Sequence, residues 1–247
     1  MKLTVLGCSD AFGTGGRLQT SFHVAHDGGA FLIDCGATTL IGLQRQGLDP
    51  NGVPAIFITH LHGDHFGGLV WWLVHAVHVG KRTTPLTVTG PVGIEKRLAD
   101  ACEALFPGSS AAPRGFDLTF IEYSEQTPIK LAAVSVTAFE VSHPSGAPSY
   151  ALRVTADDRT ITFSGDTEWV ENLIPASAGA DLYITDCYGY VAPVRFHMNW
   201  ATIKANLPRI SAKRVLLSHM GREMLAHVDQ VTSDHVLAAH DGLVLDI

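Results

Sequence analysis

The stretch IFITHLHGDHFGG, residues 56–68, determines how the rest of the chain is interpreted. Residues 55–59 are apolar or β-branched and predict a short buried strand. Side chains alternate along an extended chain, so His60, His62 and Asp64 are expected to point the same way where that strand ends. Scattered surface histidines of a loop are the alternative, but so dense a cluster directly after a buried strand favours a metal site.

His65 continues the cluster in a second direction, because it opens an apolar, helix-like run over residues 66–79. Imidazole and carboxylate groups are common ligands of zinc, manganese and iron. Two directions from one strand end suit two adjacent metal ions, with His60 and His62 facing one ion and Asp64 and His65 facing the other. Three residues near the cluster have no side chain, which would let the backbone approach such a site closely. They are Gly63, Gly67 and Gly68.

The composition limits the class of protein. The chain has 247 residues, of which 46% are hydrophobic and 17% charged, which suits one large or two small domains with a real core. A net charge of −7 argues against a broad basic surface for nucleic acid. The beginning of the chain does not resemble a signal peptide, and no apolar run reaches the length of a membrane span.

The cysteines indicate the compartment. They are far apart and form no CxxC pair, so we expect reduced, buried thiols in a cytoplasmic protein. The four are Cys8, Cys35, Cys102 and Cys187.

Four further polar residues stand directly after predicted strands. They are Asp34, His143, Asp166 and His219, after strands expected at residues 30–33, 134–141, 160–163 and 214–217. Asp34 could accept a hydrogen bond from a ligand imidazole and so orient it. Asp166 stands beside a glycine and could bind one cation with each of its two oxygens. Turn or helix capping is the alternative for both aspartates. A lone histidine after a strand, as at His143, is a weak signal unless a metal site needs a further ligand.

Other features concern the rim of such a site. A glycine-rich loop over residues 8–20 lacks the Lys-Ser/Thr of a P-loop, so it suits a mobile rim better than a nucleotide cradle. His75 and His78 are expected to be core or rim residues. The arginines considered for a phosphate clamp are Arg17, Arg195 and Arg222, each of which is more often a plain surface residue. Residues 232–239 are expected to form a short helix.

The pattern HxHxDH followed by two glycines resembles the metallo-β-lactamase superfamily, and the rest of the chain agrees. Residues 33–36 read IDCG and residues 164–167 read SGDT, both similar to superfamily motifs. Pattern alone indicates only mixed α and β structure. The resemblance implies an α+β fold, a four-layer αββα sandwich, with residues 1–247 forming a single domain.

The resemblance also implies the metal ligands. Two divalent ions are expected, with zinc favoured and manganese or iron as alternatives. The first ion would take His60, His62, His143 and Asp166, and the second would take Asp64, His65, Asp166 and His219. A hydroxide between the ions would be the nucleophile, because two cations about 3.5–4 Å apart lower the pKa of a shared water. Asp64 would orient that hydroxide.

Asp186 and His197 indicate which branch of the superfamily the chain resembles. A strand expected at residues 181–186 ends at Asp186, and His197 precedes a helical run to residue 207. This pair resembles the phosphodiesterase branch, which includes ribonuclease Z and the cyclic phosphodiesterase of phosphonate breakdown. There an acidic residue orients a histidine that protonates the leaving oxygen, so Asp186 and His197 are expected in those roles. Penicillin-cleaving members of the main branch carry cysteine at the position of Asp166, which disfavours a β-lactamase.

The chain differs from ribonuclease Z and from the cyclic phosphodiesterase in features that bear on the substrate we expect. Ribonuclease Z carries a long basic arm between the positions of His143 and Asp166, whereas one hairpin fills that interval here, and the chain is acidic. Transfer RNA is therefore disfavoured as a partner. The early cysteine cluster of the cyclic phosphodiesterase is absent. We expect a small or cyclic phosphodiester as substrate and no membrane partner. The alternatives are a lactone or thioester hydrolase on the same metals, ribonuclease Z-like RNA processing, and a non-catalytic metal-binding protein. A homodimer is considered because family members that the chain resembles are often dimers, but the sequence itself does not give the oligomeric state.

Overall fold

The computed structural model describes residues 1–231 and 233–247, and within them the strands form two sheets of seven. The first sheet consists, in spatial order, of β14 (Val244–Asp246), β1 (Lys2–Gly7), β2 (Ser21–His26), β3 (Gly29–Ile33), β4 (Ala55–Phe57), β5 (Leu86–Gly90) and β6 (Leu118–Glu122). The second consists of β13 (Val236–Ala238), β12 (Val215–Ser218), β11 (Leu182–Asp186), β10 (Arg159–Phe163), β9 (Ser149–Ala156), β8 (Val134–Val141) and β7 (Ile129–Leu131).

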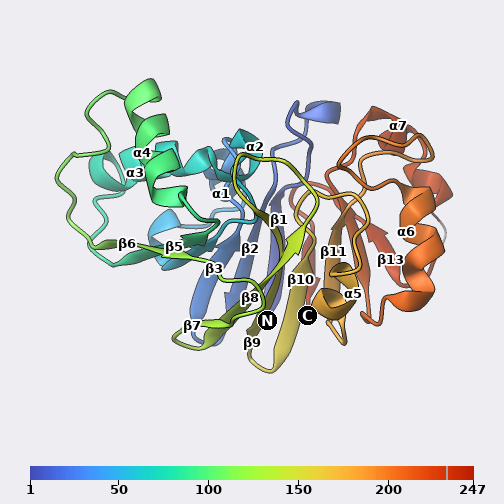
Figure 1. The fold of residues 1–247 in the computed structure, drawn as a ribbon. Helices are drawn as coiled ribbons and strands as arrows, with labels where there is room; N and C mark the ends of the chain where they lie inside the picture. Colours follow the sequence, from blue (N-terminus) through green and yellow to red (C-terminus); the bar gives the residue numbers. More distant parts are fainter. Residues whose placement is uncertain (232) are drawn as a thin grey trace.

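The helices form two outer layers (Figure 1). Those on the first sheet are α1 (Thr39–Arg45), α3 (Gly68–His78) and α4 (Ile94–Leu105), and those on the second sheet are α5 (Leu173–Ser177), α6 (Trp200–Asn206) and α7 (Arg222–Ala226). The short helix α2 (Gly63–Phe66) lies near the top centre of Figure 1. The short 3-10 turns are η1 (Thr14–Gly16), η2 (Pro50–Gly52), η3 (Leu207–Arg209) and η4 (Val228–Gln230).

The alternation of side chains along the strands explains the layers. In β3, Phe31 and Ile33 point into the core shared by the two sheets, whereas Leu32 packs under the helices of the first sheet. In β11, Leu182 joins the shared core, whereas Tyr183 packs under the helices of the second sheet. Because both faces of these strands are covered, nearly every position in them is apolar. The prediction of a four-layer αββα sandwich is confirmed.

Some expected elements differ from the structure. The strand expected at residues 55–59 ends at Phe57. The helix expected over 66–79 is α3, which covers Gly68–His78, and the short helix α2 before it was not expected. The helix expected at 232–239 is wrong within the described residues, because Val236–Ala238 forms β13 and pairs in parallel with β12. Residue 232 itself lies outside the described residues. Apolar residues that complete a sheet edge resemble a short helix in sequence, since length cannot separate the two.

The strand directions bring several strand ends to one edge of the sandwich. β3, β4 and β5 are parallel in the first sheet, and β10, β11 and β12 are parallel in the second. The carboxyl ends of parallel strands meet at the same edge, so the residues that follow them gather there. Among the described helices, none combines the length and the apolar character needed to cross a bilayer.

Candidate metal centre and acid–base pair

The end of β4 sends ligands in two directions. The amide of Ile58 donates to the carbonyl of Thr89 at 2.8 Å, which keeps the chain extended beyond β4. His62 remains extended, with φ −81° and ψ 149°, and is the residue before α2. The helix then carries Asp64 and His65 away from the line of the strand. The change from strand to helix therefore produces the two directions that the sequence predicted.

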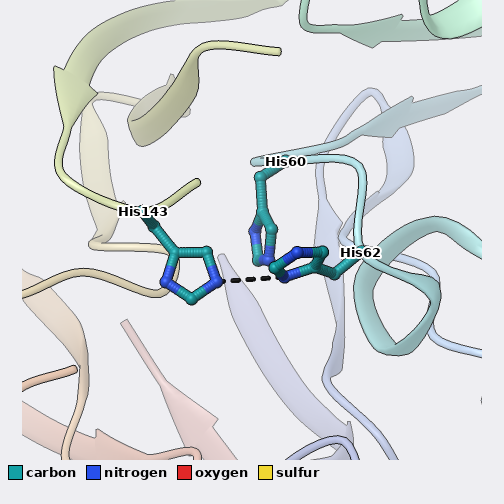
Figure 2. A group of neighbouring side chains, drawn as sticks. All are labelled: His60, His62 and His143. Atoms are coloured by element: carbon teal, nitrogen blue, oxygen red, sulfur yellow. Dashed lines mark hydrogen bonds between the residues drawn. The ribbon is translucent and has the colours of Figure 1, made fainter. Parts of the chain in front are cut away.

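The first group of donor atoms comes from three histidines (Figure 2). One nitrogen each of His60, His62 and His143 lies within 4.8 Å of the other two. Nε2 of His143 and Nδ1 of His62 are 3.0 Å apart, although they come from residues 81 positions apart in the chain. Three imidazole nitrogens converging on one point are a typical arrangement for a transition-metal ion.

The second group contains Asp64, His65, Asp166 and His219, whose donor atoms also lie within 4.8 Å of one another. Oδ1 of Asp166 is 3.2 Å from Nε2 of His65, and its Oδ2 is 3.2 Å from Nε2 of His219. Oδ2 of Asp166 also lies 3.8 Å from Nε2 of His60. The Asp166 carboxylate therefore lies between the two groups, where a bridging ligand would lie.

The orientation of His65 is fixed by a buried carboxylate. Nδ1 of His65 is 2.6 Å from Oδ2 of Asp34, which is fully buried. The amide and hydroxyl of Thr59 donate to Asp34 at 2.7 and 2.8 Å, so the carboxylate itself is held in place. With Nδ1 donating to Asp34, Nε2 faces Asp64 and Asp166. Asp34 thus has the contact that its position in the sequence predicted.

Three other imidazoles have a polar contact at Nδ1, from a backbone carbonyl or a hydroxyl group. Nδ1 of His143 donates to the backbone carbonyl of Phe196 at 3.0 Å. Nδ1 of His60 is 3.0 Å from Oγ1 of Thr59, and Nδ1 of His219 is 3.4 Å from Oγ1 of Thr20. Each contact leaves Nε2 of the ring free to face the centre of the site.

The polar atoms at the centre fit a cation. Nε2 of His60, Nε2 of His65 and Oδ1 of Asp166 are buried and make no hydrogen bond of good geometry with the described residues, although the last two lie 3.2 Å apart. Buried polar atoms are normally hydrogen-bonded, so three such atoms at one point need an explanation. The donor set of imidazoles and carboxylates is the set that zinc, manganese and iron accept. The residues therefore fit a divalent metal ion.

The protonation states of two residues agree with this fit. Burial opposes charge on Asp166, but His219, His65 and His60 outweigh it and hold the pKa of the carboxyl well below its usual value. Burial keeps the pKa of the His60 imidazole well below its usual value. A neutral imidazole and an ionised carboxylate are the forms that bind metal.

His65 differs from these two residues. Asp166, Asp64 and Asp34 outweigh burial and raise the pKa of the His65 imidazole well above its usual value. A metal ion there would therefore take the place of its Nε2 proton.

A separate acid–base pair lies beside the donor groups. Nδ1 of His197 is 2.9 Å from Oδ2 of Asp186, which is fully buried. The ring of His197 stacks on that of His219 with centroids 5.3 Å apart. Its donor atom lies within 4.8 Å of those of His143 and Asp166, so it faces the same centre. Burial opposes the charge on His197, but Asp186 outweighs burial and raises the pKa of the imidazole to about 9.

The glycines near the cluster differ in importance. A Cβ added to Gly68 would lie 2.1 Å from the carbonyl oxygen of Gly36, and one added to Gly67 would lie 2.5 Å from that of Gly63. Around Gly63 itself, a Cβ would meet nothing within 4 Å. The expected close approach of backbone therefore holds for Gly67 and Gly68 and is wrong for Gly63.

The three arginines considered for a phosphate clamp are placed differently. Arg17 donates to the carbonyl of Ala239 at 3.0 Å, so its Nη1 has a structural partner. Arg222 is exposed at the start of α7. Arg195 is exposed and lines the same pocket as His197. Of the three, Arg195 has the position best suited to contact a substrate.

The loop over residues 8–20 is held by its own side chains. Asp10, which is 1% exposed, accepts from the amide and the hydroxyl of Thr14 at 3.0 and 2.6 Å. This carboxylate therefore organises the loop and belongs to none of the donor groups of the described residues. His75 and His78, in the last turn of α3, also lie outside those groups.

Sequence reasoning missed two supporting contacts. The carbonyl of Phe196 orients His143, and the carbonyl of Cys8 accepts the amide of His219 at 3.0 Å. Both are backbone groups, which every residue carries, so no residue type could have indicated them. Phe196 has a φ of +65°, an unusual value for a bulky residue, and this too is invisible in sequence.

Solved structures with the same fold cover the whole chain. The metallo-β-lactamase fold protein YhfI from Bacillus subtilis aligns with a TM-score of 0.80 and 22% identity over 99% of this chain and 98% of that one. The short form of human tRNase Z aligns with a TM-score of 0.80 and 25% identity over 100% and 99%. The fold and the His/Asp cluster together define a protein of the metallo-β-lactamase superfamily.

The family follows from the sequence as a whole. The family model described as anti-Pycsar protein Apyc1 matches residues 1–241, so the chain belongs to that family. Ribonuclease Z from Lachnoclostridium phytofermentans is 32% identical over 162 residues, which is 65% of this chain and 51% of that protein. The chain thus spans about half the length of the curated relatives it matches. The expected resemblance to the superfamily and to its ribonuclease Z branch is confirmed.

Proposed function

We propose that the protein hydrolyses a small phosphodiester, cyclic esters included. The observation that carries this proposal is the pair formed by His197 and Asp186, 2.9 Å apart, at the edge of the His/Asp donor groups. A phosphodiester has a poor leaving group, and a positioned acid accelerates its departure by about 10²–10⁴-fold. A nucleophile alone would suffice for esters with good leaving groups.

The proposed metal ligands follow the two donor groups. His60, His62, His143 and Asp166 would hold one divalent ion, and Asp64, His65, Asp166 and His219 would hold a second. When bound, two such ions supply a water of lowered pKa as nucleophile and neutralise charge on the phosphate. Zinc is the favoured identity, and manganese and iron suit the same ligands.

The protein's own residues complete the reaction. Asp64, whose pKa stays below its usual value because His65 outweighs burial, is ionised and accepts a hydrogen bond from the attacking water. The new bond joins the water oxygen to phosphorus, and the bond from phosphorus to the leaving oxygen breaks. His197 gives its Nε2 proton to that oxygen. Asp186 stabilises the charged imidazole before the transfer and fixes its tautomer.

The surroundings of the site favour a small substrate. Between His143 and Asp166 the chain forms only β9 and β10, a simple antiparallel hairpin. The net charge of −7 is unsuited to a large polyanion, whose binding depends on many basic contacts. All four cysteines are buried free thiols, which supports our proposal of a reducing, cytoplasmic setting.

Ribonuclease Z-like processing of RNA is the second candidate. It is favoured by the 32% identity to the Lachnoclostridium phytofermentans ribonuclease Z over 65% of this chain. Cleavage of a precursor transfer RNA, compared with hydrolysis of a dinucleoside phosphate, separates the two candidates. Faster turnover of the small substrate, per active site, supports our proposal.

The deciding experiment compares a phosphodiester, a lactone and a β-lactam on one preparation. Bis(p-nitrophenyl) phosphate, a lactone and nitrocefin are assayed beside a determination of metal content. We expect phosphodiester turnover with about two metal ions per chain. Lactone turnover without phosphodiester turnover would show that the metal site serves a different reaction. A preparation that never holds two ions would contradict the proposed centre.

A further inference from the structure

The loop that carries His197 runs from residue 188 to residue 199, between β11 and α6. Backbone bonds close its base, where the amide of Tyr188 donates to the carbonyl of Met198 at 2.9 Å. The middle of the loop, residues 190–196, belongs to no helix or strand. The position of His197 therefore depends on the other groups that hold this stretch.

Glu223 of α7 binds the middle of the loop through backbone amides. Its Oε2 accepts from the amide of Tyr190 at 3.0 Å, and its Oε1 accepts from the amide of Ala192 at 3.5 Å. The bond from Tyr190 is the largest influence that lowers the pKa of the Glu223 carboxyl below its usual value. Hydrogen bonds to an ionised carboxylate are stronger than those between neutral groups, so one side chain can hold the loop here.

Tyr190 attaches the loop to the segment that follows α7. Its ring stacks on that of His227, with centroids 4.6 Å apart and an angle of 8° between the planes. Its hydroxyl donates to Oε1 of Gln230 at 3.1 Å. Nδ1 of His227 in turn donates to the carbonyl of Glu223 at 2.8 Å. Tyr190, His227 and Glu223 therefore form one packed unit against the loop.

Asn199 holds the same stretch through its carbonyl groups. Its Nδ2 donates to the carbonyl of Val191 at 3.0 Å, and its Oδ1 accepts from the amide of Thr202 at 2.8 Å at the start of α6. The side chain is almost completely buried. Glu223 thus binds amides of the loop and Asn199 binds carbonyls, so the loop is held from two elements at once.

Glu223 also connects the loop to the metal centre. It stands four residues after His219, a member of the second donor group. Between these two residues, the amide of Gly221 donates to the carbonyl of Tyr188 at 3.0 Å, at the base of the loop. The segment that supplies a donor atom therefore also holds the loop that carries His197.

The bond to Asp186 does not by itself determine where the other nitrogen of His197 lies. Asp186 bonds Nδ1 at 2.9 Å, whereas the proton in the proposed reaction leaves from Nε2. The amide of His197 donates to the carbonyl of Val194 at 3.1 Å, so its backbone moves with the part of the loop that Glu223 holds. We infer that Glu223 is a positioning residue for the general acid, and that it keeps Nε2 of His197 within the roughly 2.6–3.2 Å that proton transfer requires. The inference rests on the proposed phosphodiesterase activity.

The test measures kcat of Glu223→Ala on two phosphodiesters, with zinc at saturation. On a dinucleoside phosphate kcat should fall about tenfold, because misplacing a catalytic group by about 1 Å can cost about 10²-fold. On bis(p-nitrophenyl) phosphate it should fall less than about twofold, because nitrophenolate departs unprotonated. KM should stay within about twofold on both, since the interaction is needed only in the transition state. Glu223→Gln keeps the length and an acceptor oxygen, so it should restore most of the loss.

A matched control removes a neighbouring carboxylate. Asp229 is exposed in η4, six residues after Glu223. Asp229→Ala should leave kcat unchanged on both substrates. An equal loss of kcat on the two substrates in Glu223→Ala, or no loss on the dinucleoside phosphate, would overturn the inference.

Hydrogen exchange followed by mass spectrometry separates this inference from the proposed function. The amides of residues 190–197 should exchange about tenfold faster in Glu223→Ala than in the wild type, because local opening becomes easier. Asp229→Ala should exchange at the wild-type rate. Faster exchange in Glu223→Ala, in a protein that turns over no phosphodiester, would contradict the proposed reaction and support the hold of Glu223 on the loop. Wild-type exchange in Glu223→Ala, with phosphodiester turnover intact, would overturn the role of Glu223 alone.

Discussion

At the scale of single residues, the site depends on pairs in which a second group fixes the first. Asp34 fixes His65 at 2.6 Å, and Asp186 fixes His197 at 2.9 Å. Both aspartates are fully buried, so neither contacts solvent, and each acts through its histidine. We propose different chemistry for the two pairs: His65 shares a donor group with Asp64, Asp166 and His219, whereas His197, whose donor atom lies near those of His143 and Asp166, would deliver a proton.

The role of His197 predicts a dependence on the leaving group. Replacing His197 with alanine should lower kcat about 10²–10⁴-fold on a dinucleoside phosphate, whose alkoxide needs a proton to depart. On bis(p-nitrophenyl) phosphate the loss should be far smaller, because nitrophenolate departs unprotonated. Steady-state kinetics on both substrates checks this. His78→Ala, which changes an exposed histidine of α3 outside the donor groups, is the control. An equal loss on both substrates would remove His197 from the role of general acid.

The role of Asp34 predicts a loss of metal binding. Asp34→Asn should weaken metal affinity about 10–100-fold, because the amide no longer fixes the tautomer of His65. Competition with a chromophoric chelator measures this directly, without an activity assay. Asp100→Asn, at an exposed carboxylate that pairs with Lys96, should leave affinity unchanged. Unaltered metal affinity in Asp34→Asn would mean that the 2.6 Å contact has no part in binding.

At the scale of elements, the close approach of two backbone segments holds the site together. The amide of Gly68 at the start of α3 donates to the carbonyl of Cys35 at 2.8 Å, just beyond β3. A side chain at Gly68 would collide with that segment, and the collision would be transmitted to the helix that carries Asp64 and His65.

This contact predicts a contrast between two similar substitutions. Gly68→Ala should destabilise the fold by about 1–3 kcal/mol, since the added methyl would meet backbone that cannot move aside. Gly63→Ala, five positions earlier, should change stability by less than about 0.5 kcal/mol, because the methyl meets open space. Chemical unfolding of both variants checks the contrast. Similar stability of the two variants would show that the segment can shift at little cost.

The junction before β11 predicts a pH-dependent contribution to stability. Asp181 accepts from the amide of Thr160 at 2.8 Å and from Nζ of Lys213 at 2.7 Å. Burial alone would raise its pKa, but the hydrogen bonds from Lys213, Thr160 and Arg159 outweigh burial and lower it. The ionised Asp181 carboxylate therefore stabilises the fold fully above its unfolded-state pKa of about 3.9. This stabilisation is lost as the pH falls through the lower pKa that Asp181 has in the folded protein.

The corresponding variant is Asp181→Asn. At pH 7 it should lower the free energy of unfolding by about 1–3 kcal/mol, and this deficit relative to the wild type should shrink as the pH falls below about 4. Urea unfolding at a series of pH values measures the deficit. A deficit that stays constant down to acid pH would assign it to packing instead of charge.

The metal-ligand cluster could be predicted from the sequence, whereas some secondary-structure elements and the pocket beside His197 could not. The cluster from His60 to His65 was found because four ligand side chains follow one strand, and side-chain chemistry is visible in sequence. The short helix α2 was not predicted, and β13 was predicted as a helix, because its parallel pairing with β12 is a tertiary contact that the sequence does not show. The pocket beside His197 was not predictable, since the segments that line it meet only in the folded chain. The prediction of a single domain stays a prediction.

At the scale of the whole molecule, the two sheets each supply part of the donor set. The chain after β4 in the first sheet carries His60, His62, Asp64 and His65, and the strands of the second sheet lead to His143, Asp166 and His219. Metal ions bound there would join the two sheets at one edge, in addition to the apolar core between them.

This arrangement predicts that metal removal destabilises the whole fold. A ligand held at 1,000 times its Kd contributes about 4 kcal/mol, so chelation should lower the thermal midpoint by about 10 °C or more. Calorimetry with and without a chelator measures the shift, and added zinc should restore it. Asp100→Asn should show the same shift as wild type, whereas Asp166→Asn should show little. An unchanged midpoint after complete removal of metal would contradict the proposed junction.

The peptide that joins Phe196 to His197 connects two parts of the site. Its carbonyl orients His143, and the residue that follows is His197, which is bonded to Asp186. A displacement of this one peptide would therefore change the orientation of His143 and the position of His197 together, so a substitution that shifts the loop should perturb metal binding and proton transfer in the same variant.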